Sequence, residues 1–172
     1  RLIKAKTDLM DAVKPEAREH WLSRIENVLR AEDNPSIPRN GRAGTMEGES
    51  LIMHNGLKID PMSYYGHALM KMLIDNKGVH EPQEEKIFQE VLKSMDQGKP
   101  LVMMELGAYW SFYSMWLLSM FPKAHCFMVE PDKKNLYYGK KNFATNGFNG
   151  KFIHAGIGKA KVNRDNVTTV DQ

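Results

Sequence analysis

Apolar positions in the second half of the chain follow two alternating spacings. Short apolar runs that suit buried strands lie at 101–106, 125–130 and 150–158. Between them, apolar residues recur at helical spacing over about 112–120 and 133–143. Short strands that alternate with helices are typical of a parallel sheet with crossover helices. The pattern therefore predicts an α/β fold for this half.

Three segments in the first half also carry apolar residues at helical spacing. They are expected to form helices within 15–33, 63–78 and 80–100. In the third segment, Pro82 suits the first turn and Gly98 suits the terminator. Its apolar stripe, expected to belong to the core, consists of Ile87, Phe88, Val91, Leu92 and Met95.

Residues 33–50 are rich in proline, glycine and polar side chains, as is typical of a flexible linker. We therefore expect residues 1–50 to form an N-terminal helix and a linker. Residues 51–172 are expected to form a Rossmann-like domain.

Composition narrows the class of protein. The chain has 172 residues, of which 42% are hydrophobic and 26% charged, which suits a globular protein. Its formal charge of +3 is too small to argue for a nucleic acid partner. No apolar run approaches the roughly 18 residues of a membrane span. The one cysteine, Cys126, cannot form an internal disulfide and is expected to be buried, so we expect a cytoplasmic protein.

An acid, a glycine and a sharp turn meet at the end of the strand at 101–106. Ligands of open parallel sheets gather where strands end, and Gly107 would let one approach the backbone. Ala108 is nearly as small, and Glu105 can accept hydrogen bonds. Glu130 ends the next strand, 25 residues after Glu105. That offset is close to the roughly 20 residues at which a carboxylate holds ribose hydroxyls, so a nucleoside-containing cofactor is predicted.

The turn also argues against a dinucleotide. A pyrophosphate needs a GxGxxG loop with exposed backbone amides, whereas "GAYWSF" has one glycine and the bulky Tyr109 and Trp110. A cofactor without phosphates is therefore favoured.

Residues 78–171 resemble the FkbM family of class I S-adenosylmethionine-dependent methyltransferases. The segment "MELGAYWSFYS" is similar to the family's turn, "EP" follows the second strand, "KKNFATNG" is similar to the end of its helix, and "KFIHAGIG" to its third strand. The matching residues are Glu105, Gly107, Ala108, Phe112, Ser114, Glu130, Pro131, Asn142, Asn146, Gly147, Ala155 and Gly158.

The resemblance implies a Rossmann-like class I methyltransferase fold with an additional N-terminal helical segment. It implies S-adenosylmethionine as cofactor and methyl transfer to a hydroxyl of a sugar-like, glycan or other small-molecule acceptor. About seven strands are expected in such a fold, so its C-terminal part would lie beyond residue 172.

The family also implies roles for individual residues. Glu105, Gly107 and Ala108 would hold the methionine and ribose part of the cofactor, and Glu130 would accept from both ribose hydroxyls. Adenine would lie near Pro131 and Ala155. Glu81 would approach the amino group of the cofactor.

Two residues depart from the family pattern. Tyr109 and Ser111 stand where the family has asparagine and a second glycine, so both crowd the turn and would lie near the cofactor. Serine can keep the turn if its φ stays negative. Gly139 lies inside the helix at 133–143, where glycine costs about 1 kcal/mol relative to alanine, so we expect a close packing contact there.

The sequence does not predict a metal or catalytic site from the remaining polar residues. The histidines, His54, His80 and His154 among them, lack metal-ligand spacing and have no neighbour in sequence that would orient them, so neither a metal nor a catalytic base is predicted. The lysines of "KKNLYYGKKN" are expected to form a solvated helix face.

Two alternatives to the methyltransferase stay open. One is a degenerate methyltransferase-like module that binds without catalysis, because the turn is crowded. The other is a nucleotide-dependent oxidoreductase on the same scaffold, which the missing glycines disfavour.

Overall fold

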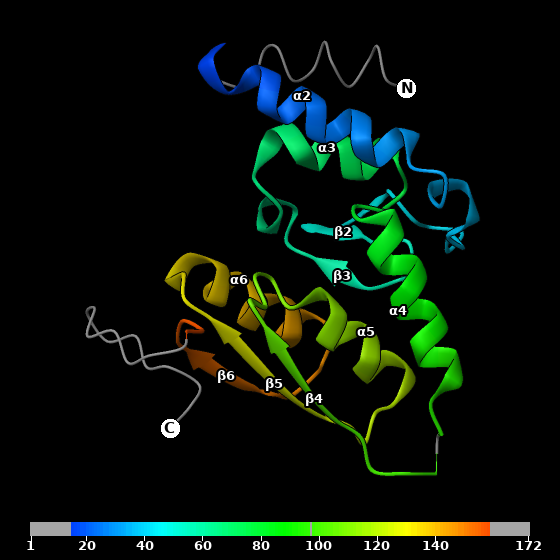
Figure 1. Cartoon of the computed structure of the whole chain (residues 1–172), viewed down its shortest axis with the longest axis vertical. Helices are drawn as coiled ribbons and strands as arrows, with labels where there is room; N and C mark the ends of the chain where they lie inside the picture. Colours follow the sequence, from blue (N-terminus) through cyan, green and yellow to red (C-terminus); the bar gives the residue numbers. More distant parts are fainter. Residues whose placement is uncertain (1–14, 97, 159–172) are drawn as a thin grey trace. The chain divides into compact units, whose positions relative to one another are not determined.

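The computed structural model describes residues 15–96 and 98–158. The chain divides into two compact units, Arg1–Ser94 and Met95–Gln172 (Figure 1). The sequence predicted a boundary after residue 50, whereas residues 33–50 belong to the same unit as the elements that follow them up to Ser94.

The described part of the first unit combines three helices with a small antiparallel sheet. The helices are α2 (Pro15–Arg30), α3 (His67–Asp75) and α4 (Pro82–Ser94), with short 3-10 turns η1 (Asn34–Ser36) and η2 (Pro61–Ser63). The strands, which the sequence pattern did not predict, are β1 (Met46–Glu47), β2 (Ser50–Ile52) and β3 (Lys58–Ile59), in the order β1-β2-β3. Figure 1 shows α2 alongside α3 in this unit.

The segment expected to be a linker is tied down by hydrogen bonds. Arg39 donates to the backbone carbonyl of Asn34 at 2.5 Å and to its side chain at 2.6 Å. Asn34 in turn donates to the side chain of Asn76 at 3.1 Å. Ile37 is only 2% exposed, so its burial adds an apolar anchor.

The core of the first unit is formed by apolar side chains that are almost fully buried. They are Ile25, Ile37, Leu51, Met53, Ile59, Leu69, Met72 and Leu73. The predicted stripe of α4 is core only in part: Leu92 is buried, but Ile87 and Val91 are 65% and 41% exposed. The stripe is wider than the face of the helix that packs.

The second unit confirms the predicted alternation of strands and helices. Its elements are β4 (Val102–Leu106), α5 (Phe112–Met120), β5 (His125–Glu130), α6 (Lys133–Thr145) and β6 (Lys151–His154). The three strands that the structure describes in this unit are parallel, in the order β4-β5-β6.

Both crossovers of the second unit run in the same direction across the sheet, so right-handed connections place α5 and α6 on one face. Val102, Met104 and Leu106 of β4 alternate along the strand and are exposed. Cys126 of β5 is buried, as expected, and burial raises the pKa of its thiol to about 11.

Within 15–96 and 98–158, none of the helices combines the length and the apolar character needed to cross a membrane. Residues 167–172, which the resemblance assigns to the segment before a fourth strand, lie outside the described residues.

Candidate functional site

The strand register of the second unit brings most of the predicted cofactor residues to one edge of the sheet. Leu106 pairs with Val129, and Val129 pairs with Ile153. The residues that follow these positions, Gly107 and Glu130, are therefore neighbours at the carboxyl edge. The amides of Gly107 and Ala108 both donate to the carbonyl of Val129 at 2.9 Å, which folds the turn over the end of β5.

Gly107 leaves its backbone open, as the sequence predicted. Its φ is +73°, a conformation that glycine adopts at little cost. A Cβ built at this position would meet no atom within 4 Å. The backbone here is therefore accessible to a ligand.

Glu130 is buried and accepts hydrogen bonds mainly from the backbone. Its Oε2 accepts from the amide of Tyr109 at 2.8 Å. Its Oε1 accepts from the amide of Asp132 at 2.9 Å and from the side chain of Asn135 at 3.3 Å. Each carboxylate oxygen can accept two hydrogen bonds, so Oε2 retains capacity for one hydroxyl.

Glu105 caps the start of α5. Its Oε2 accepts from the amide of Ser114 at 3.2 Å and also from the Ser114 hydroxyl. An amide in the first turn of a helix has no partner within the helix, so the carboxylate satisfies it and complements the helix dipole. The predicted contact of Glu105 with a cofactor stays a prediction.

The turn after Gly107 contains two non-glycine residues with positive φ, Tyr109 at 49° and Ser111 at 63°. The condition that the φ of Ser111 stays negative is not met, and the turn has a backbone geometry that suits asparagine and glycine. Side chains in this region cost about 1 kcal/mol or more in backbone strain.

Ser111 is 1% exposed and packs against α6. A Cβ on Gly139 would lie 2.7 Å from its Oγ and 3.1 Å from Phe152, which confirms the close contact predicted for this glycine. The Ser111 hydroxyl is buried and has no hydrogen-bond partner among the described residues.

The residues predicted to lie near adenine are placed at the same edge. Pro131 follows Glu130 and is exposed, and its carbonyl lies 2.9 Å from Nε2 of His154. Ala155 follows β6 and is 1% exposed. A contact of either residue with adenine remains a prediction.

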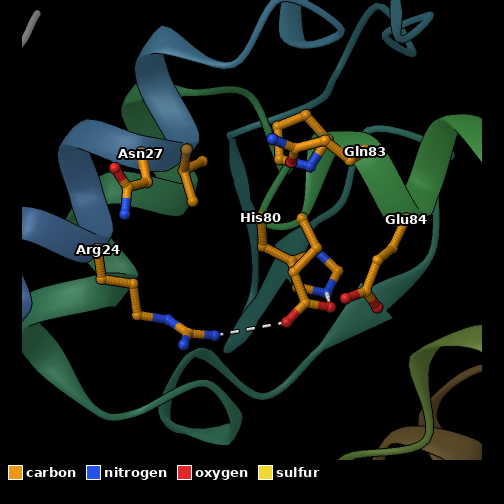
Figure 2. Close-up of a pocket in the computed structure, with 8 residues that line it drawn as sticks. Arg24, Asn27, His80, Gln83 and Glu84 are labelled. Carbon is orange, nitrogen blue, oxygen red and sulfur yellow. Dashed lines mark hydrogen bonds and ion pairs between the residues drawn. The ribbon is translucent and has the colours of Figure 1, made fainter.

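Glu81 belongs to the first unit, where it lines a pocket of about 360 Å³. Figure 2 shows Arg24 and Asn27 of α2 on one side of this pocket, opposite His80, Gln83 and Glu84. The full lining consists of Arg24, Asn27, Val28, His80, Glu81, Pro82, Gln83 and Glu84.

A buried carboxylate lies beside this pocket, between two histidines. Glu85 is fully buried, with its Oε1 2.5 Å from Nδ1 of His80 and its Oε2 3.6 Å from Nε2 of His54. Burial alone would lower the pKa of His80, but the charge of Glu85 and their hydrogen bond outweigh it and raise that pKa. Burial would likewise raise the pKa of Glu85, but His80 lowers it. Burial lowers the pKa of His54 to about 4.

The sequence analysis missed this cluster because its members come from separate segments. Gly78 brings them together: a Cβ there would lie 2.3 Å from the amide nitrogen of His54 and 2.5 Å from the Cα of Met53. The expectation that nothing orients the histidines is therefore wrong for His80. No group of three or more metal-ligating side chains that could hold a metal occurs within the described part of the chain.

Comparisons with known proteins give little. No protein family and no curated protein matches the chain. Among solved structures, it is similar to the crystal structure of the SAM-dependent methyltransferase from Agrobacterium tumefaciens, with 19% identity and a TM-score of 0.36. That match covers 42% of this chain and 24% of the other, and a score this low assigns neither fold nor function.

Proposed function

We propose that the protein is an S-adenosylmethionine-dependent methyltransferase of the FkbM type that methylates a hydroxyl of a sugar-like, glycan or other small-molecule acceptor. One observation carries the proposal: at the carboxyl edge, the open backbone of Gly107 lies beside the carboxylate of Glu130, which can still accept a hydroxyl. We expect a protein of this kind to act in the cytoplasm, without a nucleic acid partner.

The residues present fit such a cofactor at two points. Space at Gly107 allows a ligand to approach the backbone. Oε2 of Glu130 retains acceptor capacity for one ribose hydroxyl. Gly107, Ala108 and Glu130 would thus hold the ribose side, with Pro131 and Ala155 near adenine.

The bound cofactor supplies an activated methyl group on a sulfonium. Gly107, Ala108 and Glu130 would hold the cofactor, which would supply this methyl group to an acceptor hydroxyl, and the hydroxyl proton would pass to a base or to water. The protein's main contribution is alignment, because holding oxygen, carbon and sulfur in line removes much of the entropic barrier. No described residue is assigned as the base.

Ligand-dependent thermal stability tests the proposal against its alternatives. A ligand that binds only the folded protein raises the apparent Tm, by an amount set by its concentration relative to its Kd. We expect S-adenosylhomocysteine at about 100 times its Kd to raise the Tm by several degrees, and NADH to leave it unchanged. A shift with NADH alone would favour the oxidoreductase.

The crowded turn gives the non-catalytic module a specific supporting observation, the positive φ of Tyr109 and Ser111. If that module is correct, neither ligand shifts the Tm of the wild-type protein. A response to S-adenosylhomocysteine that appears only in Ser111→Gly would identify the turn as the cause.

A further inference from the structure

Helix α6 and the residues that follow it carry an uneven share of the positive charge of the chain. Residues 133–158 contain five lysines and no acidic residue, whereas the whole chain has a formal charge of only +3. Four of these lysines belong to α6 itself, where no acid lies at the i+3 or i+4 spacing that would pair with them along the helix. The small total charge therefore conceals a strongly basic local region.

The lysines of α6 share one side of the helix. At about 100° per residue, Lys133, Tyr137 and Lys140 lie within about 60° of arc, and Lys134 and Lys141 lie on the adjoining flank. The opposite side packs against β5 and β6, and its buried residues are Leu136, Gly139, Asn142 and Phe143. The outward side, called here the basic face of α6, is exposed along its length and consists of Lys133, Lys134, Tyr137, Lys140, Lys141 and Ala144.

The charges of this face are accessible to a partner. Within the residues that the structure describes, Lys133, Lys134 and Lys140 make no ion pair with a carboxylate. The ammonium of Lys140 lies 5.9 Å from the centre of the Phe152 ring, which is the outer limit of a cation–π contact. An anionic partner would therefore not have to displace a carboxylate from these three lysines.

Tyr137 lies among the lysines and is 60% exposed. Its ring meets the ring of Tyr138 edge-on, with centroids 5.5 Å apart. A tyrosine has an apolar ring and a polar tip, which suits the headgroup layer of a lipid membrane. Lysine has a similar character, because its aliphatic stem can lie along apolar surface while the ammonium stays among polar groups. The face thus combines two residue types that suit a headgroup layer.

We propose that the basic face of α6 binds the surface of a membrane that carries anionic phospholipids, with the ring of Tyr137 at the level of the headgroups. Clusters of four to eight basic residues on a helix are typical of such binding. Lys133 and Lys140 are separated by about 10 Å along the helix, too far for one small anion to contact both, whereas a lipid surface presents negative charge along the whole face. The inference goes beyond the proposed function and does not depend on it.

A nucleic acid is the other polyanion that a basic helix can contact, and it fits this face less well. Base edges are read mainly by arginine, asparagine and glutamine side chains, whereas this face presents lysine, tyrosine and alanine. Proteins that bind single strands use a basic groove with several aromatic rings on which successive bases stack. Here Tyr137 lies on the convex side of a helix, which suits contact with a broad surface.

Sedimentation of the full chain with lipid vesicles tests the inference. We expect binding to vesicles of phosphatidylserine and phosphatidylcholine, little binding to phosphatidylcholine alone, and release as NaCl is raised from about 0.05 M to about 0.5 M. Lys133→Gln/Lys134→Gln should weaken binding by about 20-fold, since each basic residue near an anionic surface contributes roughly fivefold. Lys99→Gln/Lys123→Gln is the matched control, because it removes the same charge from exposed lysines that precede β4 and β5, and it should bind as the wild type does.

Three outcomes would overturn the inference. The first is no binding of the wild type to vesicles that contain phosphatidylserine. The second is an equal loss in the control variant, which would assign the binding to net charge instead of the basic face. The third is tighter binding to a labelled RNA oligonucleotide than to the vesicles, lost in Lys133→Gln/Lys134→Gln, which would assign the face to a nucleic acid. Circular dichroism checks that each variant is folded, and Lys140→Gln/Lys141→Gln replaces the first variant if that one is not.

Discussion

Among residues 15–96 and 98–158, each unit buries one carboxylate, and the two are stabilised in opposite ways. Glu85 is fully buried and is compensated by the imidazole of His80 together with two backbone amides, while the imidazole of His54 lies 3.6 Å from its other oxygen. Glu130 is 5% exposed and is compensated by two backbone amides and the amide of Asn135, all of them neutral donors. The first arrangement depends on the protonation of side chains, and the second does not.

The difference indicates distinct roles for the two acids. Separating a buried carboxylate from its cationic partner leaves an uncompensated charge. Glu85 therefore stays within its cluster, which suits a structural, supporting role. Backbone amides orient Glu130 without neutralising it, and they leave capacity on one oxygen. A ligand hydroxyl can therefore be added at Glu130, which suits binding.

The largest effect that tests this contrast is expected from Glu85→Gln. Removing the charge leaves the buried imidazole of His80 without its carboxylate partner, so we expect the free energy of unfolding to fall by about 3–5 kcal/mol. Urea denaturation measures it. Glu84→Gln, an exposed neighbour, should change stability by no more than about 0.5 kcal/mol. A loss below about 1 kcal/mol for Glu85→Gln would show that the cluster is not a charge-compensated unit.

The first cluster should make the stability of the protein sensitive to acid. The pKa of His54 is about 4 in the folded protein and 6.5 as its ordinary value, so the unfolded chain binds a proton first as the pH falls through this range. The free energy of unfolding should therefore drop between pH 6.5 and 4, by at most about 3 kcal/mol. His80, whose pKa is raised, acts only above pH 6.5 and in the opposite direction.

Chemical denaturation at pH 6.5 and pH 5 checks this prediction. The pKa of Glu85 is lowered from 4.5, so the stability that Glu85 contributes is lost only below these two pH values. His54→Gln should flatten the difference between the two pH values, whereas His125→Gln, at an exposed position of β5, should leave it as in the wild type. If the free energy of unfolding of His54→Gln still falls between pH 6.5 and pH 5 as much as in the wild type, the acid sensitivity comes from groups other than His54.

Steric fit, not charge, should dominate the turn that faces Glu130. An alanine at Gly139 would place its Cβ 2.7 Å from Oγ of Ser111, so we expect Gly139→Ala to destabilise by about 1–3 kcal/mol. Adding Ser111→Gly should recover part of this loss, with a coupling of about 1 kcal/mol in a double-mutant cycle. If the effects of the two substitutions on the free energy of unfolding are strictly additive, Ser111 and residue 139 are not in steric contact.

The smallest effect is expected from Ser111→Gly alone, and its sign is favourable. Glycine relieves the positive φ of 63° and removes a buried hydroxyl without a described partner, so the unfolding free energy should rise by about 1 kcal/mol. Ser119→Gly, inside α5, should instead lower it by a similar amount. Destabilisation by Ser111→Gly would contradict the strain assigned to this turn.

Local patterns predicted the second unit well and the first unit in part. The positions of β4, α5, β5, α6 and β6 follow from spacing and turn residues, and the edge that carries Gly107 and Glu130 follows from parallel pairing. The small sheet β1-β2-β3 was missed because its strands are two or three residues long and leave no periodic signal.

The cluster around Glu85 could not be found from spacing, because His54 and Glu85 are brought together by packing of distant segments. A signal was present in "NKG", where Gly78 follows a helix end, but a glycine there is explained equally well as a terminator. The positive φ of Ser111 could not be predicted from the sequence either, because residue preference disfavours it and the packing of the turn decides.

Calorimetric titration of the full chain with S-adenosylhomocysteine, with Glu130→Ala and Asp132→Ala in parallel, tests the central claim most directly. Asp132 lies two residues after Glu130 and caps α6 by accepting from Lys134 and Asn135, so its loss costs helix stability without removing the carboxylate of the site. The account predicts saturable binding by the wild type and by Asp132→Ala, and none by a folded Glu130→Ala. Binding that survives in Glu130→Ala, or no binding by the folded wild type, would contradict it.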